Sequence, residues 1–308
     1  MNDALLNAFS VLLIIIVAYF FKRIRLLNVE TAKRIAYVVM YLTLPCAILT
    51  SANGISFDVS LLGVIALSAL ANCILLVVAF LTSSHPKQRM FNMLNTTCFN
   101  IGNFVIPFMQ HTMSPKAFLA LCMFDVVNAL FCFGGSYSIA LFFNRKYFPN
   151  EPVGFKTILK EMSKSLPFYV YAFVIVLSAL GLTIPEQALV PFKTIGSANT
   201  LLCFMIIGVA LSFNITWEQC KLVMKAWLVR YITCAVMAVA VWFFVPLPAE
   251  VRIIVMIILM APMTSIAPIM TMRAIPEQAE ESADLNTIAI ISSLAFITIM
   301  NSITSLLV

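Results

Sequence analysis

The feature that most constrains this chain is a series of ten apolar stretches, most of them about as long as a membrane-crossing helix. A span needs roughly 20 apolar residues, and hydrocarbon offers no partner to a free backbone group, so such a stretch must be helical. We therefore predict an all-α integral membrane protein with a single membrane domain over residues 1–308. The predicted spans are 4–21, 36–51, 61–82, 91–110, 117–143, 166–184, 198–213, 222–245, 253–272 and 286–307.

Composition agrees with a membrane protein and removes several classes of function. The chain is 62% hydrophobic and 10% charged, whereas a soluble domain carries about 25% charged residues. The eight cysteines lie mostly inside apolar stretches without a CxxC pair, and the two histidines fall near stretch ends. We therefore expect no metal, no cofactor, no nucleic-acid partner and no enzyme activity.

The basic residues predict the orientation of the chain. With the N-terminus outside, sixteen of the 19 Lys and Arg residues fall on one side of the membrane and three, Lys116, Lys193 and Arg252, on the other. The first side comprises Lys22, Arg23, Arg25, Lys33, Arg34, Lys87, Arg89, Arg145, Lys146, Lys156, Lys160, Lys164, Lys221, Lys225, Arg230 and Arg273. The positive-inside rule assigns that side to the cytoplasm, so both termini are expected outside it.

A central linker divides the predicted spans into two sets of five. Residues 144–165 contain two prolines, a glycine and five basic residues, and they separate residues 1–143 from 166–308. Because five is odd, the second repeat must be inverted relative to the first. A weak similarity between SFDVS at 56–60 and SFNIT at 212–216, which precede the third and eighth spans, supports this prediction.

The fourth span is interrupted by polar residues and a proline. Residues 95–107 read NTTCFNIGNFVIP. Pro107 removes a backbone donor and frees the carbonyls upstream, Gly102 lowers the cost of unwinding, and Asn100 and Asn103 share one helical face. This pattern is typical of a broken helix that lines a polar site at mid-membrane. The alternative is a kinked helix whose amides only bond neighbouring helices.

The ninth span, at the matching position of the second half, is disrupted in the same way. It carries Pro262, Thr264, Ser265 and Pro268. Interrupted segments at corresponding positions of two halves indicate a transporter's binding site. Asn199 in the seventh span is a further candidate for this site, and the alternative for it is a helix cap.

Asp125 is the one acidic residue well inside a predicted span. A carboxylate at that depth costs at least a few kcal/mol unless it is paired, hydrated or protonated. Asn128 follows three residues later on the same helical face. We predict that Asp125 and Asn128 form a site for a coupled proton or sodium ion; the alternative is a structural carboxyl that bonds neighbouring helices.

The whole chain resembles the auxin efflux carrier family, in particular its bacterial members. The resemblance rests on KRIR at 22–25, LPCA at 44–47, NIGNFVIP at 100–107 and APM at 261–263, together with the ten-span layout. The third stretch is similar to the family's Asn-x-Gly-x-x-Gly-x-Pro pattern. Val105 replaces its second glycine, which implies a less open backbone than in relatives.

The resemblance implies a fold shared with bile-acid symporters and sodium/proton antiporters, in which broken helices four and nine cross in a core domain beside a scaffold. Pro107 and Pro268 would be the crossover prolines, with Pro262 as the alternative for the second. The implied function is secondary transport of a small organic anion, auxin-like or a dicarboxylate, across a bacterial inner membrane by alternating access. Expected partners are that anion, a proton or sodium ion, the lipid bilayer and a second copy in a homodimer. The alternative function is a membrane sensor that binds its ligand without moving it.

Overall fold

The computed structural model describes residues 3–54, 61–109, 112–148, 154–212 and 217–307, and this part of the chain is helical without strands. The similar pentapeptides at 56–60 and 212–216 lie almost wholly outside it. The helices of the first half are α1 (Asp3–Arg23), α2 (Val29–Val38), α3 (Leu44–Ser51), α4 (Leu62–Leu81), α5 (Pro86–Thr96), α6 (Ile106–Met109), α7 (Pro115–Leu130) and α8 (Ser136–Asn144). They are followed by α9 (Phe155–Met162), α10 (Leu166–Ala179), α11 (Glu186–Ala210), α12 (Trp217–Phe244), α13 (Ala249–Leu259), α14 (Ala267–Ala274) and α15 (Ala279–Leu307).

Short π-helical turns join several of these helices. They are η1 (Val39–Thr43), η3 (Ile101–Val105) and η4 (Phe131–Gly135), and a 3-10 turn, η5 (Pro276–Gln278), precedes α15. π-turns are frequent at functional sites, and η3 lies within the stretch 95–107 that is predicted to interrupt the fourth span.

Six helical segments of the described chain are long and apolar enough to cross a membrane, which is compatible with a multi-pass membrane protein. They are Val29–Ser51, Leu62–Leu81, Pro115–Asn144, Glu186–Ala210, Gln219–Phe244 and Pro276–Met300. The fourth and ninth predicted spans are absent from this set because each is split into helices of at most 11 residues.

Several predicted boundaries are wrong. α11 begins at Glu186, twelve residues before the predicted start, because Pro191 and Lys193 interrupt the apolar pattern without interrupting the helix. The segment predicted to start at residue 36 begins with α2 at Val29, and α9 lies within the linker at 144–165.

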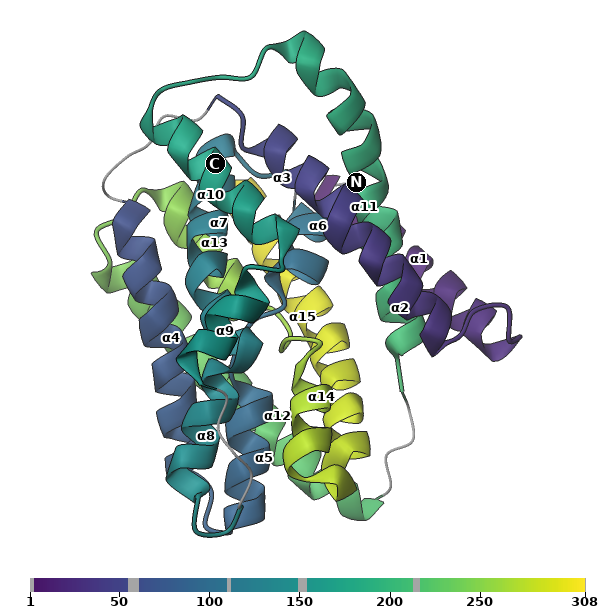
Figure 1. Ribbon diagram of the computed structural model, residues 1–308, viewed down its shortest axis with the longest axis vertical. Helices are drawn as coiled ribbons and strands as arrows, with labels where there is room; N and C mark the ends of the chain where they lie inside the picture. Colours follow the sequence, from purple (N-terminus) through teal and green to yellow (C-terminus); the bar gives the residue numbers. More distant parts are fainter. Residues whose placement is uncertain (1–2, 55–60, 110–111, 149–153, 213–216, 308) are drawn as a thin grey trace.

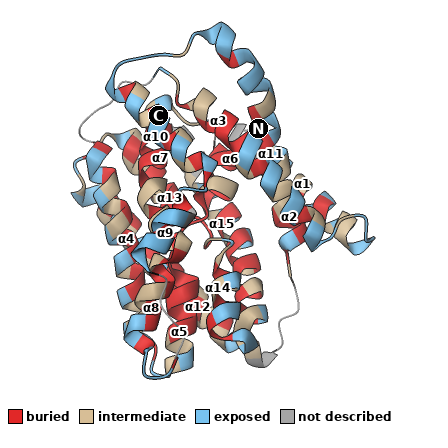
Figure 2. Cartoon of the chain, in the orientation of Figure 1, coloured by how far each residue is buried: buried red, intermediate tan, exposed pale blue. Residues whose placement is uncertain are grey.

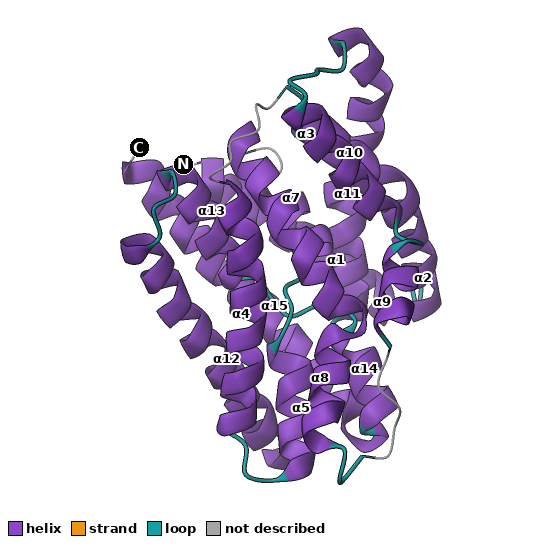
Figure 3. Cartoon of the chain, turned by 60° about the vertical axis from the view of Figure 1, so that its left-hand side comes forward, coloured by secondary structure: helices purple, strands orange, loops and turns teal. Residues whose placement is uncertain are grey.

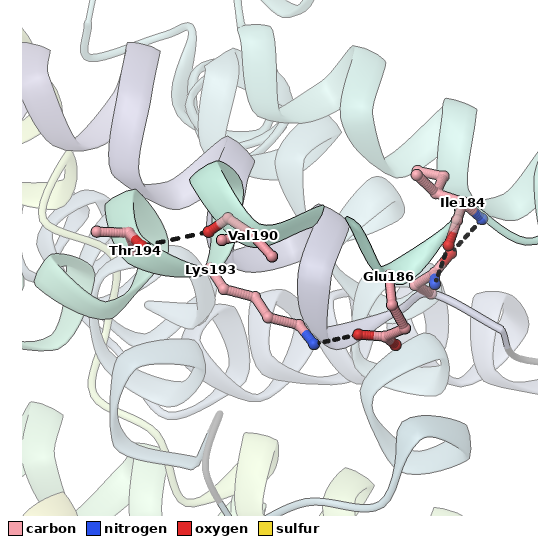
Figure 4. Close-up of polar contacts among 6 residues, drawn as sticks. Ile184, Glu186, Val190, Lys193 and Thr194 are labelled. Carbon is pink, nitrogen blue, oxygen red and sulfur yellow. Dashed lines mark hydrogen bonds and ion pairs between the residues drawn. The ribbon is translucent and has the colours of Figure 1, made fainter. Parts of the chain in front are cut away.

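Polar contacts hold the early start of α11 (Figure 4). The Asn53 side chain donates to the Ile184 carbonyl at 3.0 Å and accepts from its amide at 2.8 Å, so the end of α3 is fixed to the turn before α11. Lys193 Nζ bonds Glu186 Oε2 at 2.5 Å along the first two turns. The start of α11 is thus stabilised by local polar chemistry that hydropathy does not detect.

The helices form two groups that meet along one side. We call α1, α2, α3, α10 and α11 the scaffold group, because α11 packs along α1 and α3, as Figures 1 and 3 show. Gly208 allows this packing, since a Cβ there would lie 2.5 Å from the Ile15 carbonyl oxygen. We call α4 to α8 and α12 to α15 the core group. Its inner helices α5 and α7 carry long buried runs (Figure 2).

Helix α1 begins and helix α15 ends in the same part of the molecule in both views (Figures 1 and 3). An even number of crossings would place the two ends on one side of a membrane. The positions of the two ends are therefore compatible with an even number of crossings.

Candidate functional site: the crossing of two interrupted helices

The first interruption lies between α5 and η3. After Thr96 the chain is extended at Thr97 (φ −86°, ψ 167°) and left-handed at Cys98 (φ 62°). Helical structure resumes at Ile101. The break begins ten residues before Pro107, whereas a proline disrupts only the preceding turn. Pro107 therefore does not create the break, contrary to the reasoning from the sequence.

Three consecutive amides of this interruption are paired by different parts of the core group. The Cys98 amide donates to Asn72 Oδ1 on α4 at 3.0 Å, and the Phe99 amide donates to Asn128 Oδ1 on α7 at 3.0 Å. The Asn100 amide donates to the Pro262 carbonyl at 2.9 Å. Asn128 Nδ2 also donates to the Phe99 carbonyl at 2.9 Å. These three amides and the Phe99 carbonyl are thus satisfied by protein, as an apolar environment requires.

The second interruption, residues 260–266, joins α13 to α14 and meets the first at Asn100. We call this meeting point of the two interruptions the crossing. Asn100 Nδ2 donates to Ser265 Oγ at 3.0 Å, beside the bond from its amide to Pro262. The structure therefore brings together Asn100, Pro262 and Ser265 from the residues predicted for the site. Thr264 lies next to them and closes the turn, since its carbonyl accepts from the Ala267 amide at 3.1 Å.

The crossover prolines lie in different surroundings. Pro107 is in α6, past the break, and its carbonyl accepts from Thr200 Oγ1 of α11 at 2.9 Å. Pro268 occupies the first turn of α14. Pro262, the alternative proposed for the second crossover, makes the contact between the two interruptions.

The residues of the two interruptions differ in exposure. Residues 95–100 are each at most 5% exposed, whereas Gly102, Asn103, Thr264 and Pro268 are half-buried and Ser265 is exposed. A Cβ at Gly102 would lie 3.4 Å from Leu44 Cδ2 of α3. Gly102 therefore faces the scaffold group.

Asp125 and Asn128, the predicted ion-coupling pair, are in contact and lie beside the first interruption. Asp125 Oδ1 accepts from Asn128 Nδ2 at 3.0 Å, and the same amide group holds the Phe99 backbone. Asp125 Oδ2 accepts from the Tyr171 hydroxyl of α10 at 2.9 Å. One carboxyl therefore connects the crossing to the scaffold group. Sequence reasoning missed Tyr171, because its hydroxyl group does not interrupt the apolar pattern of α10.

Within the described residues, the hydrogen bonds of Asn199 go to residues outside the crossing. It is the fourteenth of 25 residues in α11, so it is not a helix cap. Its Oδ1 accepts from Thr43 Oγ1 at 3.1 Å, a contact within the scaffold group. Within the described residues its Nδ2 has no hydrogen-bond partner.

The position of Arg230 changes the count of basic residues on which the predicted orientation rests. It was assigned to a cytoplasmic end, but it is the fourteenth of 28 residues in α12 and is 0% exposed. Its Nη2 donates to the Ala261 carbonyl at 3.0 Å, and its Nη1 donates to the Thr96 carbonyl. Its guanidinium carbon lies 4.9 Å from the centre of the Phe99 ring. Without Arg230, the sixteen basic residues on the predicted cytoplasmic side become fifteen against three.

Asn95 is a second residue that the predicted site omitted. Its Nδ2 donates to Thr271 Oγ1 of α14 at 2.9 Å, and its Oδ1 accepts from Ser282 of α15. It therefore ties α5 to the half-helix beyond the second interruption. Its signal was present in the sequence, since it begins the disrupted stretch of the fourth span.

Within the described residues, no group of three or more His, Cys, Asp or Glu side chains has the arrangement to hold a metal ion. The chain matches no protein-family model and no curated protein.

Proposed function

We propose that this protein is a secondary transporter that carries a small organic anion across a membrane. The observation that carries this proposal is the crossing of two interrupted helices through Asn100, Pro262 and Ser265. Unwound segments that meet within a helical membrane protein are the usual way to place backbone and amide groups at a substrate site.

The less buried polar groups of the crossing favour an anion with a carboxylate. Asn103 supplies an amide and Ser265 a hydroxyl. The start of α14 lies next to Ser265 and carries the partial positive charge of a helix N-terminus. These are donors suited to a carboxylate such as an auxin-like acid or a dicarboxylate.

The proposal includes the finer architecture. Ten spans in two inverted repeats, 1–143 and 166–308, would place the interrupted α5–α6 and α13–α14 at corresponding positions. Both termini would face outward from a bacterial inner membrane, and the chain would belong to the auxin efflux carriers that it resembles.

Transport would proceed by movement of the core group against the scaffold group. Two polar contacts join these groups near the crossing, Tyr171 to Asp125 and Thr200 to the Pro107 carbonyl. Both must be remade if the core group slides. Asp125 is the group that we propose to carry the coupled proton, because its two oxygens connect the interruption to the scaffold.

The test is a thermal-unfolding screen of aliphatic and aromatic carboxylates on the purified chain, followed by uptake into sealed proteoliposomes. A ligand stabilises the state that binds it, so at least one carboxylate is expected to raise Tm and to accumulate in the vesicles. A carboxylate that raises Tm without entering the vesicles would favour the sensor. A screen in which no carboxylate raises Tm or enters the vesicles would contradict the proposal.

A further inference from the structure

Arg230 is a buried cation at the point where two half-helices end. Helices α5 and α13 have 11 residues each, and both point their C-terminal ends at the crossing. The last carbonyl of α5, at Thr96, and the Ala261 carbonyl just after α13 both accept from this one guanidinium. Carbonyls at helix ends lack partners within their own helix, and here one side chain supplies the donors.

The charges at this point are balanced by Arg230. A helix C-terminus carries the equivalent of about −0.5 elementary charge, so two such ends together amount to roughly −1. The guanidinium, which stays protonated in proteins, contributes +1. Its planar fork also reaches two carbonyls at once, which the single ammonium of a lysine matches less well.

The position of Arg230 is fixed by its own helix. The hydroxyl of the next residue, Tyr231, donates to the Ala289 carbonyl at 3.0 Å and bonds Ser293 Oγ at 2.7 Å, both on α15. Trp227 Nε1 donates to Ser292 Oγ at 2.9 Å on the same helix. Phe99 lies against the guanidinium on the side of the first interruption. The cation is therefore a permanent part of the core group.

In transporters with discontinuous helices, unwound carbonyls and C-terminal half-helix ends coordinate the coupling cation. Here those carbonyls already have donors. We propose that Arg230 is a built-in cation that replaces a sodium ion at the crossing, so that the carrier binds and uses no sodium there. This inference rests on the proposed function for its meaning in transport, although its structural part can be tested without any substrate.

The experiment measures thermal unfolding of the purified full-length chain in sodium chloride, potassium chloride and choline chloride at equal ionic strength. The parent is expected to have the same Tm in all three salts. Arg230→Gln removes the charge and leaves the two carbonyl ends uncompensated, so its Tm should fall and then recover along a saturable curve as sodium or potassium replaces choline. Arg230→Lys should retain the insensitivity of the parent.

Arg252→Gln is the matched control. Arg252 Nη1 also donates to a backbone carbonyl, that of Trp242 at 2.7 Å, and its guanidinium lies 4.8 Å from the Trp242 ring centre. This arginine is not at the crossing, so its loss should create no response to alkali cations.

Two results would overturn the inference: a saturable rise in the Tm of the parent with sodium but not choline, or an Arg230→Gln variant as indifferent to alkali cations as the parent. If Arg230→Gln does not fold, the responses of the parent and of Arg230→Lys decide the question. Carboxylate uptake into proteoliposomes separates this inference from the proposed function. Uptake that requires sodium overturns the inference alone, whereas no uptake with either sodium or choline overturns transport and leaves the thermal result to decide the role of Arg230.

Discussion

The interruption after α5 and the interruption after α13 meet at Asn100, but they have different surroundings. In the first, residues 95–100 are buried and three consecutive amides are bound by Asn72, Asn128 and the Pro262 carbonyl. In the second, Thr264 is half-buried and Ser265 is exposed, and the turn is closed mainly by its own bonds.

From this difference we infer that the two segments have different roles. The first interruption fixes the geometry, because three of its consecutive amides have partners elsewhere in the core group. The second presents polar groups that remain accessible to a ligand. Changes around the first should therefore affect stability most, and changes in the second should affect transport most.

The largest expected effect on stability comes from Asn128→Leu. The substitution leaves the Phe99 amide and carbonyl unpaired and removes a donor to Asp125. Two unpaired buried groups at about 1–3 kcal/mol each predict a loss of roughly 2–6 kcal/mol. Thermal unfolding in detergent and the yield of monodisperse protein measure it.

Asn144→Leu is the matched control, because both asparagines are 1% exposed. Asn144 Nδ2 donates to the Ala140 carbonyl one turn earlier in its own helix, and its Oδ1 has no partner within the described residues. It should lose much less stability than Asn128→Leu. Equal losses would mean that Asn128 does not support the interruption.

An intermediate effect is expected from Asp125→Asn, which preserves the shape and one accepting oxygen for Asn128 but cannot exchange a proton. If Asp125 carries the coupled proton, accumulation driven by a pH gradient should vanish while exchange of labelled for unlabelled substrate continues. Glu186→Gln, at an exposed carboxylate paired with Lys193, should behave as the parent. Gradient-driven accumulation by Asp125→Asn at the parental level rules out the coupling role.

The smallest effect on stability is expected from Ser265→Ala. Ser265 is exposed and its hydroxyl accepts one bond from Asn100, so Tm should change little. Loss of one hydrogen bond to a charged ligand, about 1.5–3 kcal/mol, predicts a rise in KM of roughly ten- to 150-fold. The kinetics of carboxylate uptake measure it.

Ser68→Ala is its control, because Ser68 is buried and donates to the Phe124 carbonyl at 2.7 Å, within the core group. It should lower Tm more than Ser265→Ala and leave KM unchanged. The opposite pattern would reverse the tasks assigned to the two interruptions.

The sequence predicted the helical class and located both interruptions, because apolar length and clusters of Asn, Gly and Pro are local signals. It also placed Asp125 beside Asn128 through their helical spacing. The contact between Asn100 and Ser265 joins residues 165 positions apart, which spacing alone does not determine; matching the interruptions of the two halves suggested it.

Other residues were missed because their role depends on tertiary contacts. Arg230 follows Lys221 and Lys225, so it was assigned to the same cytoplasmic end, although it lies nine residues further into the apolar helix than Lys221. Asn72 binds the amide of the left-handed Cys98, a contact that its place in an apolar span did not indicate. The sequence did contain a signal for Arg230, because this charge lies well inside the apolar stretch 222–245.

The most direct test of the central claim, that the two interruptions form one substrate site, is a double-mutant cycle on uptake into proteoliposomes. It compares the parent, Asn100→Ala, Ser265→Ala and the double variant, with a carboxylate that the thermal screen identifies. Because the two side chains share one hydrogen bond, the account predicts that each single change raises KM and that the double change raises it less than the product of the two. Effects that multiply independently, or single variants that transport like the parent, would contradict it.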